Sequence, residues 1–322
     1  MKAIRVAEPG GPEVLRVEEV PDPRPGAGEA LVRLEAIGVN FIEVYQRKGL
    51  YQMTLPFTPG GEGAGTVVAV GSGVTSVRVG DRVASVDFRG SYAELARAAA
   101  DRLVPVPGGV DIRTAGAVML QGMTAHYLSH ATYVLARGDW CLVHAAAGGV
   151  GLLLCQIATR LGARIIGTVS TSEKEALARE AGAEAIIRYT ERPFVDEVRR
   201  ITGGTGVRVV YDSVGQTTFE GSLDTLQRRG LMVLFGQSSG PVRPFDPQVL
   251  NRKGSLYLTR PSLAAYVVTR EELTARAGDL FAWIAQGSLR VRVHHAWPLA
   301  EAAAAHAALE GRVTMGKVLL VP

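Results

Sequence analysis

The stretch from Trp140 to Leu161 limits the possible folds of this chain more than any other part of the sequence. Residues 140–143 are apolar, alanine and glycine fill most positions from 145 to 151, and an apolar run follows. This pattern predicts a short buried strand that ends at His144, a tight turn of small residues, and a helix that begins near Gly149. A strand, a tight turn and a helix in this order are typical of the repeating unit of an α/β fold.

The small residues in this turn predict a binding site for a dinucleotide. They let a pyrophosphate approach the backbone, and the helix N-terminus offers it free N–H groups and a partial positive charge. Compared with the fingerprint G-x-G-x-x-G, Ala146 stands at the first position, whereas Gly148 and Gly151 fit. The alternative is an ordinary small-residue contact in an α/β core. A second predicted strand, Arg164 to Thr168, favours the dinucleotide site.

The residues after that second strand indicate NADPH rather than NADH. An NAD-binding chain normally has an acidic residue about 20 positions after the glycines, where it binds the ribose 2′-hydroxyl. Here hydroxyl residues occupy most positions from 168 to 172, and Lys174 follows. Hydroxyl groups and a lysine suit a 2′-phosphate, so Ser170, Lys174 and Tyr189 are the candidates. In the alternative, Ser172 caps a helix and Lys174 is solvated, and both interpretations can hold together.

Two kinds of sequence pattern predict two domains. Up to about residue 110, short strands alternate with Pro/Gly turns, which favours a barrel-like β domain with one helix from Asn40 to Gly49. From 140 to 260, strands and helices alternate, which predicts a doubly wound parallel sheet. The expected strands are 140–144, 164–168, 185–189, 207–211, 231–235 and 255–260, and the expected helices are 149–161, 172–181, 193–202 and 217–228.

The part after Pro261 lacks this alternation and is expected to return to the first domain and complete it. Its expected elements are helices near 270–286 and 299–309 and a final strand, 317–321. The predicted fold is therefore α/β, with a Rossmann-type doubly wound sheet inserted in a β domain. We expect the inserted domain to cover 123–264 and the other domain to cover 1–122 and 265–322.

Composition excludes several classes of protein. The net charge of +4 is small and scattered, so no nucleic acid partner is expected. The only cysteines, Cys141 and Cys155, fall in predicted core positions, which favours reduced thiols and a cytoplasmic location. The chain starts directly with a strand-like segment, Lys2 to Val6, so no signal peptide is expected. No apolar run reaches the ~20 residues that a membrane span needs.

Several motifs across the chain carry a resemblance to one known family. They are Val39–Glu43, Pro59–Gly65, Gly138–Asp139, Ala145–Gly151, Val210–Gly215, Phe235–Gly240 and Leu258–Leu263. The chain resembles the medium-chain dehydrogenase/reductases, in particular the zinc-free quinone oxidoreductase group that includes zeta-crystallin. The similarity spans essentially the whole chain and is greatest to bacterial NADPH:quinone reductases. It implies that the β domain is a GroES-like barrel that carries out catalysis.

The resemblance also implies a site without metal. Zinc-dependent relatives have Cys where this chain has Asn40 and His where it has Gly61, and their cysteine-rich lobe is absent. Two buried cysteines cannot build such sites, so we expect no metal. Glu62 keeps the position of a Glu that supports the metal in zinc relatives. Here we expect it only to brace Arg or backbone groups.

A nicotinamide site without metal points to an activated acceptor, such as a quinone, which accommodates charge by becoming aromatic. By resemblance, four residues lie near the nicotinamide ribose: Asn40, Phe41, Ile42 and Glu43. Tyr45 and Tyr51 line the acceptor pocket, where a hydroxyl can bind a quinone oxygen. Relatives have Asp at the position of Glu43. Asn40, Tyr45 and Tyr51 are the expected catalytic residues, and surface packing is the alternative for the tyrosines.

Further cofactor contacts follow from the same resemblance. They are Tyr127 near the phosphates or nicotinamide, Gly148, Gly149, Val150 and Gly151 at the pyrophosphate, Ser213, Phe235, Gly236, Gln237 and Ser238 at the later strand ends, and Gly316 and Lys317 near the C-terminus. The predicted strand 255–260 ends the sheet with a long, mostly apolar face. Such an edge must be covered or paired, and relatives dimerise there, so we expect a homodimer.

Two other functions compete with quinone reduction. One is reduction of an enone or alkenal with NADPH on the same fold. The other is a non-enzymatic, crystallin-like or RNA-associated protein that binds NADPH. A pocket with Tyr45 and Tyr51 favours an enzyme, and the lack of a basic stripe disfavours RNA.

Overall fold

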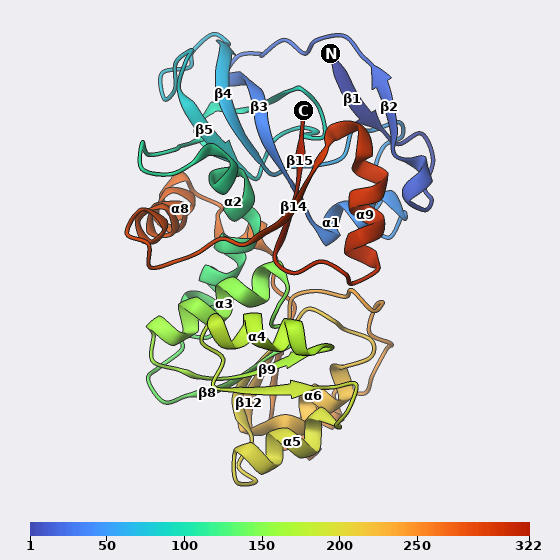
Figure 1. Cartoon of the computed structure of the whole chain (residues 1–322), viewed down its shortest axis with the longest axis vertical. Coiled ribbons are helices and arrows are strands. Elements are labelled where there is room, and N and C mark those ends of the chain that lie inside the picture. The colour runs from blue at the N-terminus through green and yellow to red at the C-terminus, as the bar shows by residue number, and fades with distance from the viewer. The chain divides into compact units, whose positions relative to one another are not determined.

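The computed structural model describes every residue from Met1 to Pro322 and divides the chain into two compact units (Figure 1). Unit 1 comprises Met1–Met123 and Val267–Pro322, and unit 2 comprises Thr124–Tyr266. The chain leaves unit 1 within helix α2 (Ile112–Tyr127) and re-enters it after Tyr266. Unit 2 is therefore one continuous segment between the two segments of unit 1.

Unit 2 is built on a six-stranded parallel sheet with the order β10-β9-β8-β11-β12-β13. Its strands are β8 (Trp140–Val143), β9 (Arg164–Val169), β10 (Ala185–Arg188), β11 (Val207–Asp212), β12 (Leu226–Leu234) and β13 (Tyr257–Thr259). Numbered along the chain, this order is 3-2-1-4-5-6, the doubly wound arrangement of dinucleotide-binding folds. The predicted fold class is confirmed.

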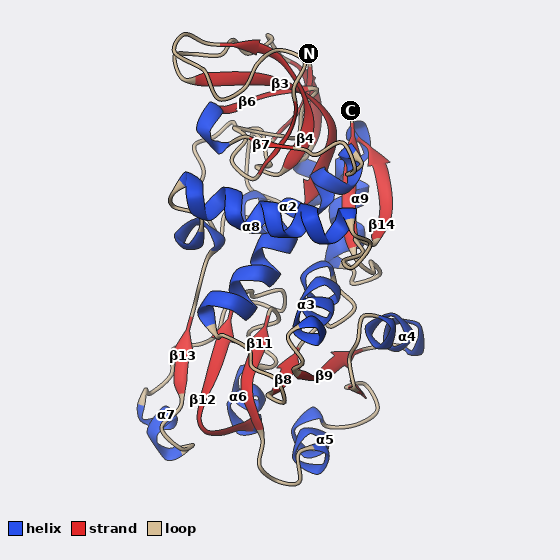
Figure 2. Cartoon of the chain, turned by 90° about the vertical axis from the view of Figure 1, so that its left-hand side faces the viewer, coloured by secondary structure: helices blue, strands red, loops and turns tan.

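Helices cover both faces of this sheet, as Figure 2 shows, with α3 and α4 on one face and α5 and α6 on the other. The helices are α3 (Gly149–Arg160), α4 (Ser172–Glu180), α5 (Phe194–Ile201), α6 (Phe219–Thr225) and α7 (Gln248–Arg252). Leu142, Ile166, Val210 and Met232 from four adjacent strands are fully buried in the core. A parallel sheet covered on both faces needs such continuous apolar strands, which is why they were recognisable in the sequence.

Two elements of unit 2 differ from the expectation. Helix α6 ends at Thr225 rather than at residue 228, and β12 begins at once, with a register shift against β11 and Arg229 at φ 60°. Strand β13 has only three residues because Gly254 and Ser255 take left-handed φ values of 108° and 57° before it. The expected long apolar face on 255–260 is therefore wrong.

Unit 1 contains a seven-stranded sheet with the order β14-β15-β3-β4-β5-β7, in which β6 also pairs with β3. The strands are β3 (Glu29–Val39), β4 (Gly63–Val70), β5 (Arg82–Ser85), β6 (Leu95–Ala99), β7 (Val104–Pro105), β14 (Val293–Pro298) and β15 (Lys317–Val321), and a separate hairpin joins β1 (Lys2–Arg5) to β2 (Arg16–Glu19). The eleven-residue strand β3 pairs with β4, β6 and β15, so it is the centre of the sheet. Its buried side chains Val32, Leu34 and Ile37 lie in the main apolar core.

The last segment of the chain completes this sheet, as expected, because β15 pairs antiparallel with β3. We expected no alternation of strands and helices in this segment. That prediction is wrong, since β14 and β15 form a parallel pair with helix α9 (Ala302–Glu310) between them. The sequence pattern does not predict strand β14, because His294, His295 and Pro298 interrupt any alternation of apolar and polar residues.

The remaining helices of unit 1 are α1 (Phe41–Arg47) and α8 (Arg270–Ala285). Short helical turns are η1 (Pro12–Val14), η2 (Ala100–Arg102), η3 (Leu128–Thr132, a π-helical turn of unit 2), η4 (Leu263–Tyr266, also in unit 2) and η5 (Leu299–Glu301). None of the helices combines the length and apolar character that a bilayer-spanning segment requires.

Candidate active site

The turn between β8 and α3 is shaped by close approach of the backbone to itself. A Cβ on Gly151 would lie 2.3 Å from the carbonyl oxygen of Ala145 and 2.8 Å from the backbone of Ala146, so only glycine fits there. Ala145 takes a left-handed φ of 52°, and Gly148 is the N-cap of α3. The N-terminus of this twelve-residue helix thus follows a turn of small side chains. Such a cradle fits the pyrophosphate of a dinucleotide.

The residues expected to recognise a 2′-phosphate come together in unit 2. Ser170 follows β9 and Tyr189 follows β10, and the N–H of Tyr189 donates to the carbonyl of Val169 at 3.1 Å. Lys174 lies in the first turn of α4, which starts directly after β9. The structure therefore places all three at the carboxyl ends of two neighbouring parallel strands, where such folds bind ligands.

Helix α4 is capped by Thr171, whose hydroxyl accepts a hydrogen bond from the backbone N–H of Lys174 at 3.3 Å. The alternative interpretation, in which Ser172 is the cap, is wrong because Ser172 is already the first helical residue. The positions between β9 and α4 are filled by Ser170 and Thr171, not by a carboxylate. The residues that join β9 to α4 thus present no like charge to a negatively charged ligand group, and the acidic residues Glu173 and Glu175 lie in the first turn of α4 on either side of Lys174.

A buried polar network that the sequence did not reveal lies at the carboxyl ends of β8, β9 and β11. His144 contacts the hydroxyl of Thr168 through Nδ1 at 2.9 Å and that of Ser222 through Nε2 at 3.0 Å. The Ser222 hydroxyl donates to Asp212 Oδ2 at 2.9 Å. Burial lowers the pKa of His144, and the nearby Asp212 opposes this only in part, so the imidazole is neutral. The network fixes the ends of three strands next to the cradle.

The loops after β11 and β12 lie side by side. The N–H of Phe235 donates to the carbonyl of Asp212 at 2.9 Å, and that of Ser238 donates to the carbonyl of Ser213 at 3.1 Å. A Cβ on Gly236 would lie 2.6 Å from the Ser213 carbonyl oxygen. Ser213 and the segment Phe235–Ser238, with Gln237, therefore form one continuous backbone surface at the same edge of the sheet.

Tyr127 is buried and stacks on Tyr266, with ring centroids 4.2 Å apart and planes 11° apart. The Tyr266 hydroxyl accepts a hydrogen bond from Thr132 at 2.9 Å, in the π-helical turn η3. Burial raises the pKa of Tyr127 well above its ordinary value, so its hydroxyl stays protonated. In the structure the ring of Tyr127 serves packing within unit 2.

Unit 1 contains a buried ionic cluster around Asn40, which is 4% exposed, with Glu62 at 0% and Lys317 at 1%. The Lys317 ammonium donates to Asn40 Oδ1 at 2.7 Å and forms an ion pair with Glu62. Asn40 Nδ2 donates to Glu62 Oε2 at 2.8 Å, and the backbone N–H of Leu120 donates to Glu62 Oε1 at 2.7 Å. Glu62 thus braces a backbone group, as expected, but its cationic partner is a lysine and not an arginine. Lys317, expected at the cofactor, directs its ammonium into this cluster.

Two further side chains complete the cluster. The backbone N–H of Asn40 donates to Glu43 Oε2 at 2.7 Å, and Gln121 Nε2 donates to Asn40 Oδ1 at 3.2 Å. Burial raises the pKa of Glu43 to about 8. The Lys317 ammonium opposes this rise in pKa, and the Glu62 carboxylate adds to it. Glu43 is therefore protonated at neutral pH. Gln121 Oε1 is buried without a partner.

Helix α1 carries the residues expected at the acceptor. Asn40 is its N-cap, and Gly49, with φ 74°, follows its end, as the sequence predicted. Tyr45 is 8% exposed and Tyr51 is 38% exposed, and their rings meet edge to face with centroids 5.5 Å apart. Phe41 packs on Tyr45 at 6.1 Å between centroids, and Ile42 is 39% exposed. Gly316 takes a left-handed φ of 93° directly before β15. The two tyrosines are thus brought together.

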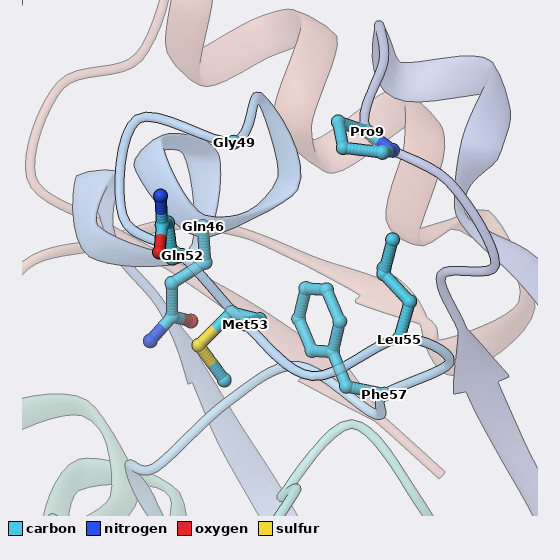
Figure 3. A pocket seen from close by; sticks show the side chains of 7 residues that line it. All are labelled: Pro9, Gln46, Gly49, Gln52, Met53, Leu55 and Phe57. Carbon is cyan, nitrogen blue, oxygen red and sulfur yellow. The ribbon is translucent and has the colours of Figure 1, made fainter.

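A pocket of about 220 Å³ lies beside this segment of unit 1 (Figure 3). Its lining residues are Pro9, Gln46, Gly49, Gln52, Met53, Leu55 and Phe57. Figure 3 shows Leu55 and Phe57 on the side nearest Pro9, with Gln46, Gln52 and Met53 grouped together. Neither Tyr45 nor Tyr51 lines it, so it is not the acceptor pocket expected from these tyrosines.

The C-terminal end of α1 is anchored by Arg47, which is fully buried. It donates to the carbonyl of Gly10 at 3.1 Å, to Nδ1 of His306 at 3.2 Å, and to Glu310 at 2.5 Å. Burial, together with Arg47, lowers the pKa of His306 to about 3, so the neutral ring accepts from Arg47 and donates from Nε2 to the Tyr92 hydroxyl at 2.9 Å. These contacts hold α1 against α9 and fix the helix that carries Tyr45.

The structure has no group of three or more His, Cys, Asp or Glu side chains placed to hold a metal ion. Cys141 and Cys155 are free and buried, and burial raises the pKa of Cys155 to about 12. A Cβ on Gly61 would lie 2.6 Å from the carbonyl oxygen of Val86, so a side chain there requires the backbone to move. Around Asn40, an ammonium stands among the oxygen atoms, and an ammonium is not a metal ligand.

Comparisons with known proteins agree with this architecture. Residues 26–141 match the alcohol dehydrogenase GroES-like domain, and residues 149–281 match the family described as zinc-binding dehydrogenase. The quinone oxidoreductase of Pseudomonas aeruginosa is 48% identical over 323 residues, which cover 100% of this chain and 99% of that protein. A 2-haloacrylate reductase from a Burkholderia species is 42% identical over 97% of this chain and 96% of that protein.

A solved structure extends the comparison to three dimensions. The structure of Escherichia coli quinone oxidoreductase complexed with NADPH is 47% identical, covers 100% of both chains and has a TM-score of 0.98. Both the sequence match and the structural match run from end to end. The chain therefore belongs to the medium-chain dehydrogenase/reductase family, in its quinone oxidoreductase group.

Proposed function

We propose that this chain reduces quinones by hydride transfer from NADPH without a metal ion. The observation that carries the proposal is the edge of the parallel sheet, where a glycine cradle lies beside a strand end followed by hydroxyl residues and Lys174, with no carboxylate between β9 and α4. The relatives named quinone oxidoreductase, one of them solved with NADPH, support the same activity.

On the cofactor side, the residues of unit 2 have separate tasks. The N-terminus of α3, at Gly148–Gly151 with Val150, receives the pyrophosphate, and Ser170, Lys174 and Tyr189 receive the 2′-phosphate. The backbone of Ser213 and Phe235–Ser238 positions the rest of the dinucleotide. A phosphate gains most from donors fixed before it binds, and the buried network around His144 fixes these strand ends.

On the acceptor side, Asn40, Tyr45 and Tyr51 provide polar groups in unit 1. NADPH supplies the hydride. The quinone takes up this hydride and one proton from water and becomes an aromatic hydroquinone, so its oxygen atom develops less charge than that of a simple ketone. The tyrosine hydroxyls and the Asn40 amide orient the quinone and donate to its oxygen atoms.

The enone reductase alternative has a specific observation in its favour, the relative named 2-haloacrylate reductase. A haloacrylate carries a carbon–carbon double bond conjugated to a carboxylate, and hydride addition to it needs the same cofactor geometry. A charged carboxylate would require a cation at the acceptor. In unit 1 the ammonium nearest Asn40, that of Lys317, is already paired with Glu62. We therefore favour the neutral quinone.

A homodimer through β13 is part of the proposal. This strand is the last of the sheet and pairs only with β12, so its outer edge has free backbone groups. Tyr257 on it is 61% exposed. Pairing of two such edges would cover them.

The decisive experiment follows NADPH oxidation with a panel of quinones, enones, haloacrylates and simple ketones, before and after dialysis against a strong chelator. We expect turnover with quinones above all and no loss after dialysis. Activity confined to enones or haloacrylates would favour the alternative. NADPH binding without turnover of any acceptor would leave only the non-enzymatic function. Stoichiometric zinc whose removal abolishes activity would overturn the mechanism.

A further inference from the structure

The ammonium of Lys317 and the carboxylate of Glu62 approach the same amide from two sides. Lys317 Nζ lies 2.7 Å from Asn40 Oδ1, and Glu62 Oε2 lies 2.8 Å from Asn40 Nδ2. All three side chains are at least 96% buried, since none is more than 4% exposed. An ammonium can only donate hydrogen bonds and an ionised carboxylate can only accept them. Each partner therefore dictates which end of the amide faces it.

The opposite orientation of this amide is excluded by both partners. Turned over, the amide would bring Nδ2 against the Lys317 ammonium, two donors, and Oδ1 against the Glu62 carboxylate, two acceptors. It would also break the bond from Gln121 Nε2 to Asn40 Oδ1, which is 3.2 Å long. A polar group without a hydrogen-bond partner destabilises the folded state most where water is excluded. The ion pair thus holds Asn40 in one orientation.

In that orientation, the hydrogen-bonding capacity of Asn40 is used unevenly. Its oxygen accepts from Lys317 and from Gln121, which fills both lone pairs. Its nitrogen donates one hydrogen to Glu62, and the second hydrogen has no protein acceptor among the bonds of the cluster. The amide can therefore offer a ligand a donor but no acceptor.

We propose that Lys317, paired with Glu62, is a positioning residue that makes Asn40 present an N–H donor to an oxygen atom of the acceptor. The proposal rests on the function proposed above, in which Asn40 contacts the quinone. The quinone oxygen gains negative charge as the hydride arrives. A donor fixed in advance stabilises that charge, whereas a carbonyl in its place would repel it. Lys317 itself does not touch the substrate.

The test removes both charges together. Lys317→Met alone leaves a buried, unpaired carboxylate and destabilises the fold. The double variant Glu62→Gln/Lys317→Met keeps the volume nearly constant and removes both charged groups that fix the orientation of Asn40. We expect kcat for a quinone to fall about tenfold, which corresponds to roughly one hydrogen bond, while the Kd for NADPH stays within about twofold. Asp87→Asn, which breaks an ion pair with Arg102 elsewhere in unit 1, is the charge control and leaves both constants unchanged.

A double-mutant cycle decides whether Lys317 acts through Asn40. In an Asn40→Ala background, the double substitution should cause no further loss of kcat, because the group that it positions is absent. An equal tenfold loss in both backgrounds would show that Lys317 acts independently and would overturn the proposal. A change confined to the Kd for NADPH would also overturn it, because Lys317 would then be a cofactor contact.

A readout without turnover separates this proposal from the proposed function. Asparagine occurs only at positions 40 and 251, so a sample labelled with 15N-asparagine shows two side-chain amides. We expect the Asn40 amide hydrogens to exchange with solvent more slowly than those of exposed Asn251, and to exchange at least about tenfold faster in the double variant. Unchanged exchange at Asn40 would overturn the proposal even if quinone reduction is confirmed. If the wild type reduces no quinone, the exchange result still tests the orientation of Asn40.

Discussion

Lys174 is the residue on which we propose that the choice of cofactor depends. It lies in the first turn of α4, next to Ser170 and Thr171 at the end of β9. The spacing from the glycines could be read from the sequence because both features are local to one strand–helix–strand unit. The cluster of Asn40, Glu62 and Lys317 could not be read in this way, since Lys317 and Glu62 are 255 residues apart. Nothing in the composition of β15 indicates that its lysine points into the core.

Lys174→Ala should weaken NADPH binding and leave NADH binding nearly unchanged. The lost charge-assisted contact to a 2′-phosphate is worth ~1.5–3 kcal/mol, or roughly 10- to 150-fold in Kd. Titration calorimetry with both cofactors measures it. Arg179→Ala, on the same helix and paired with Glu175, is the control and should change neither affinity. An equal loss for NADPH and NADH would contradict the assignment.

Tyr45→Phe and Tyr51→Phe should each lower kcat/KM for a quinone by roughly three- to tenfold, because one neutral hydrogen bond contributes ~0.5–1.5 kcal/mol. The affinity for NADPH should stay constant. Steady-state kinetics at saturating NADPH provides the measurement, with exposed Tyr257→Phe as the control. No loss in the double variant would leave the two tyrosines as packing residues. A thousandfold loss would make one of them an obligatory proton donor.

At the level of whole elements, the parallel strands were the most predictable part and the connections the least. Strands β8, β9 and β11 are buried on both faces and appear in the sequence as apolar runs. Strand β14 could not be recognised, because a half-exposed strand with two histidines has no such run. The sequence predicts helix up to residue 228, where β12 has already begun, because a left-handed residue such as Arg229 is not apparent from its residue type.

Two glycine substitutions should have opposite effects on the stability of the units that contain them. Gly151→Ala places a Cβ 2.3 Å from the Ala145 carbonyl oxygen, so the turn must open, and we expect unit 2 to lose stability and affinity for NADPH. Gly278→Ala in α8 meets no atom within 4 Å and should stabilise unit 1 by about 0.5–1 kcal/mol through helix propensity. Calorimetric unfolding of both variants compares them. A Gly151→Ala protein that melts like the wild type and binds NADPH normally would show that the cradle tolerates a side chain.

At the level of the whole molecule, Glu43 links stability to pH. Its pKa of about 8 in the folded protein lies above the ordinary value of 4.5, because the carboxyl is buried. Between these two values the folded state holds a proton that the unfolded state has released. This contribution is therefore complete below pH 4.5 and is lost as the pH rises through about 8. A rise in pH therefore lowers the free energy of unfolding through Glu43.

Glu43→Gln should remove that dependence. The amide keeps an oxygen for the Asn40 N–H but carries no titrating proton. We expect the Tm of the wild type to fall more steeply than that of the variant between pH 6 and pH 9, as measured by scanning calorimetry. Parallel Tm curves would show that Glu43 does not titrate in this range. Asp87→Asn, a change of an exposed carboxylate, should follow the wild type.

The assembly of the molecule can be tested at the edge of unit 2. Tyr257→Lys places a charge on β13, which has no neighbour on its outer side, and a lysine on an edge strand opposes pairing. We expect a monomer by sedimentation velocity, whereas the wild type and Tyr257→Phe sediment as dimers. A dimer that survives Tyr257→Lys would place the interface elsewhere.

The position of β15 in its sheet sets the order in which this chain acquires structure during synthesis. The strand occupies residues 317–321, yet it lies between β14 and the central strand β3, with Val318 opposite Val39. A ribosome therefore releases every residue of unit 2 before the sheet of unit 1 can close. The nascent chain carries an incomplete β domain until residues 317–321 have been synthesised, and a truncation before residue 317 would remove an interior strand from the sheet that β3 began to build much earlier.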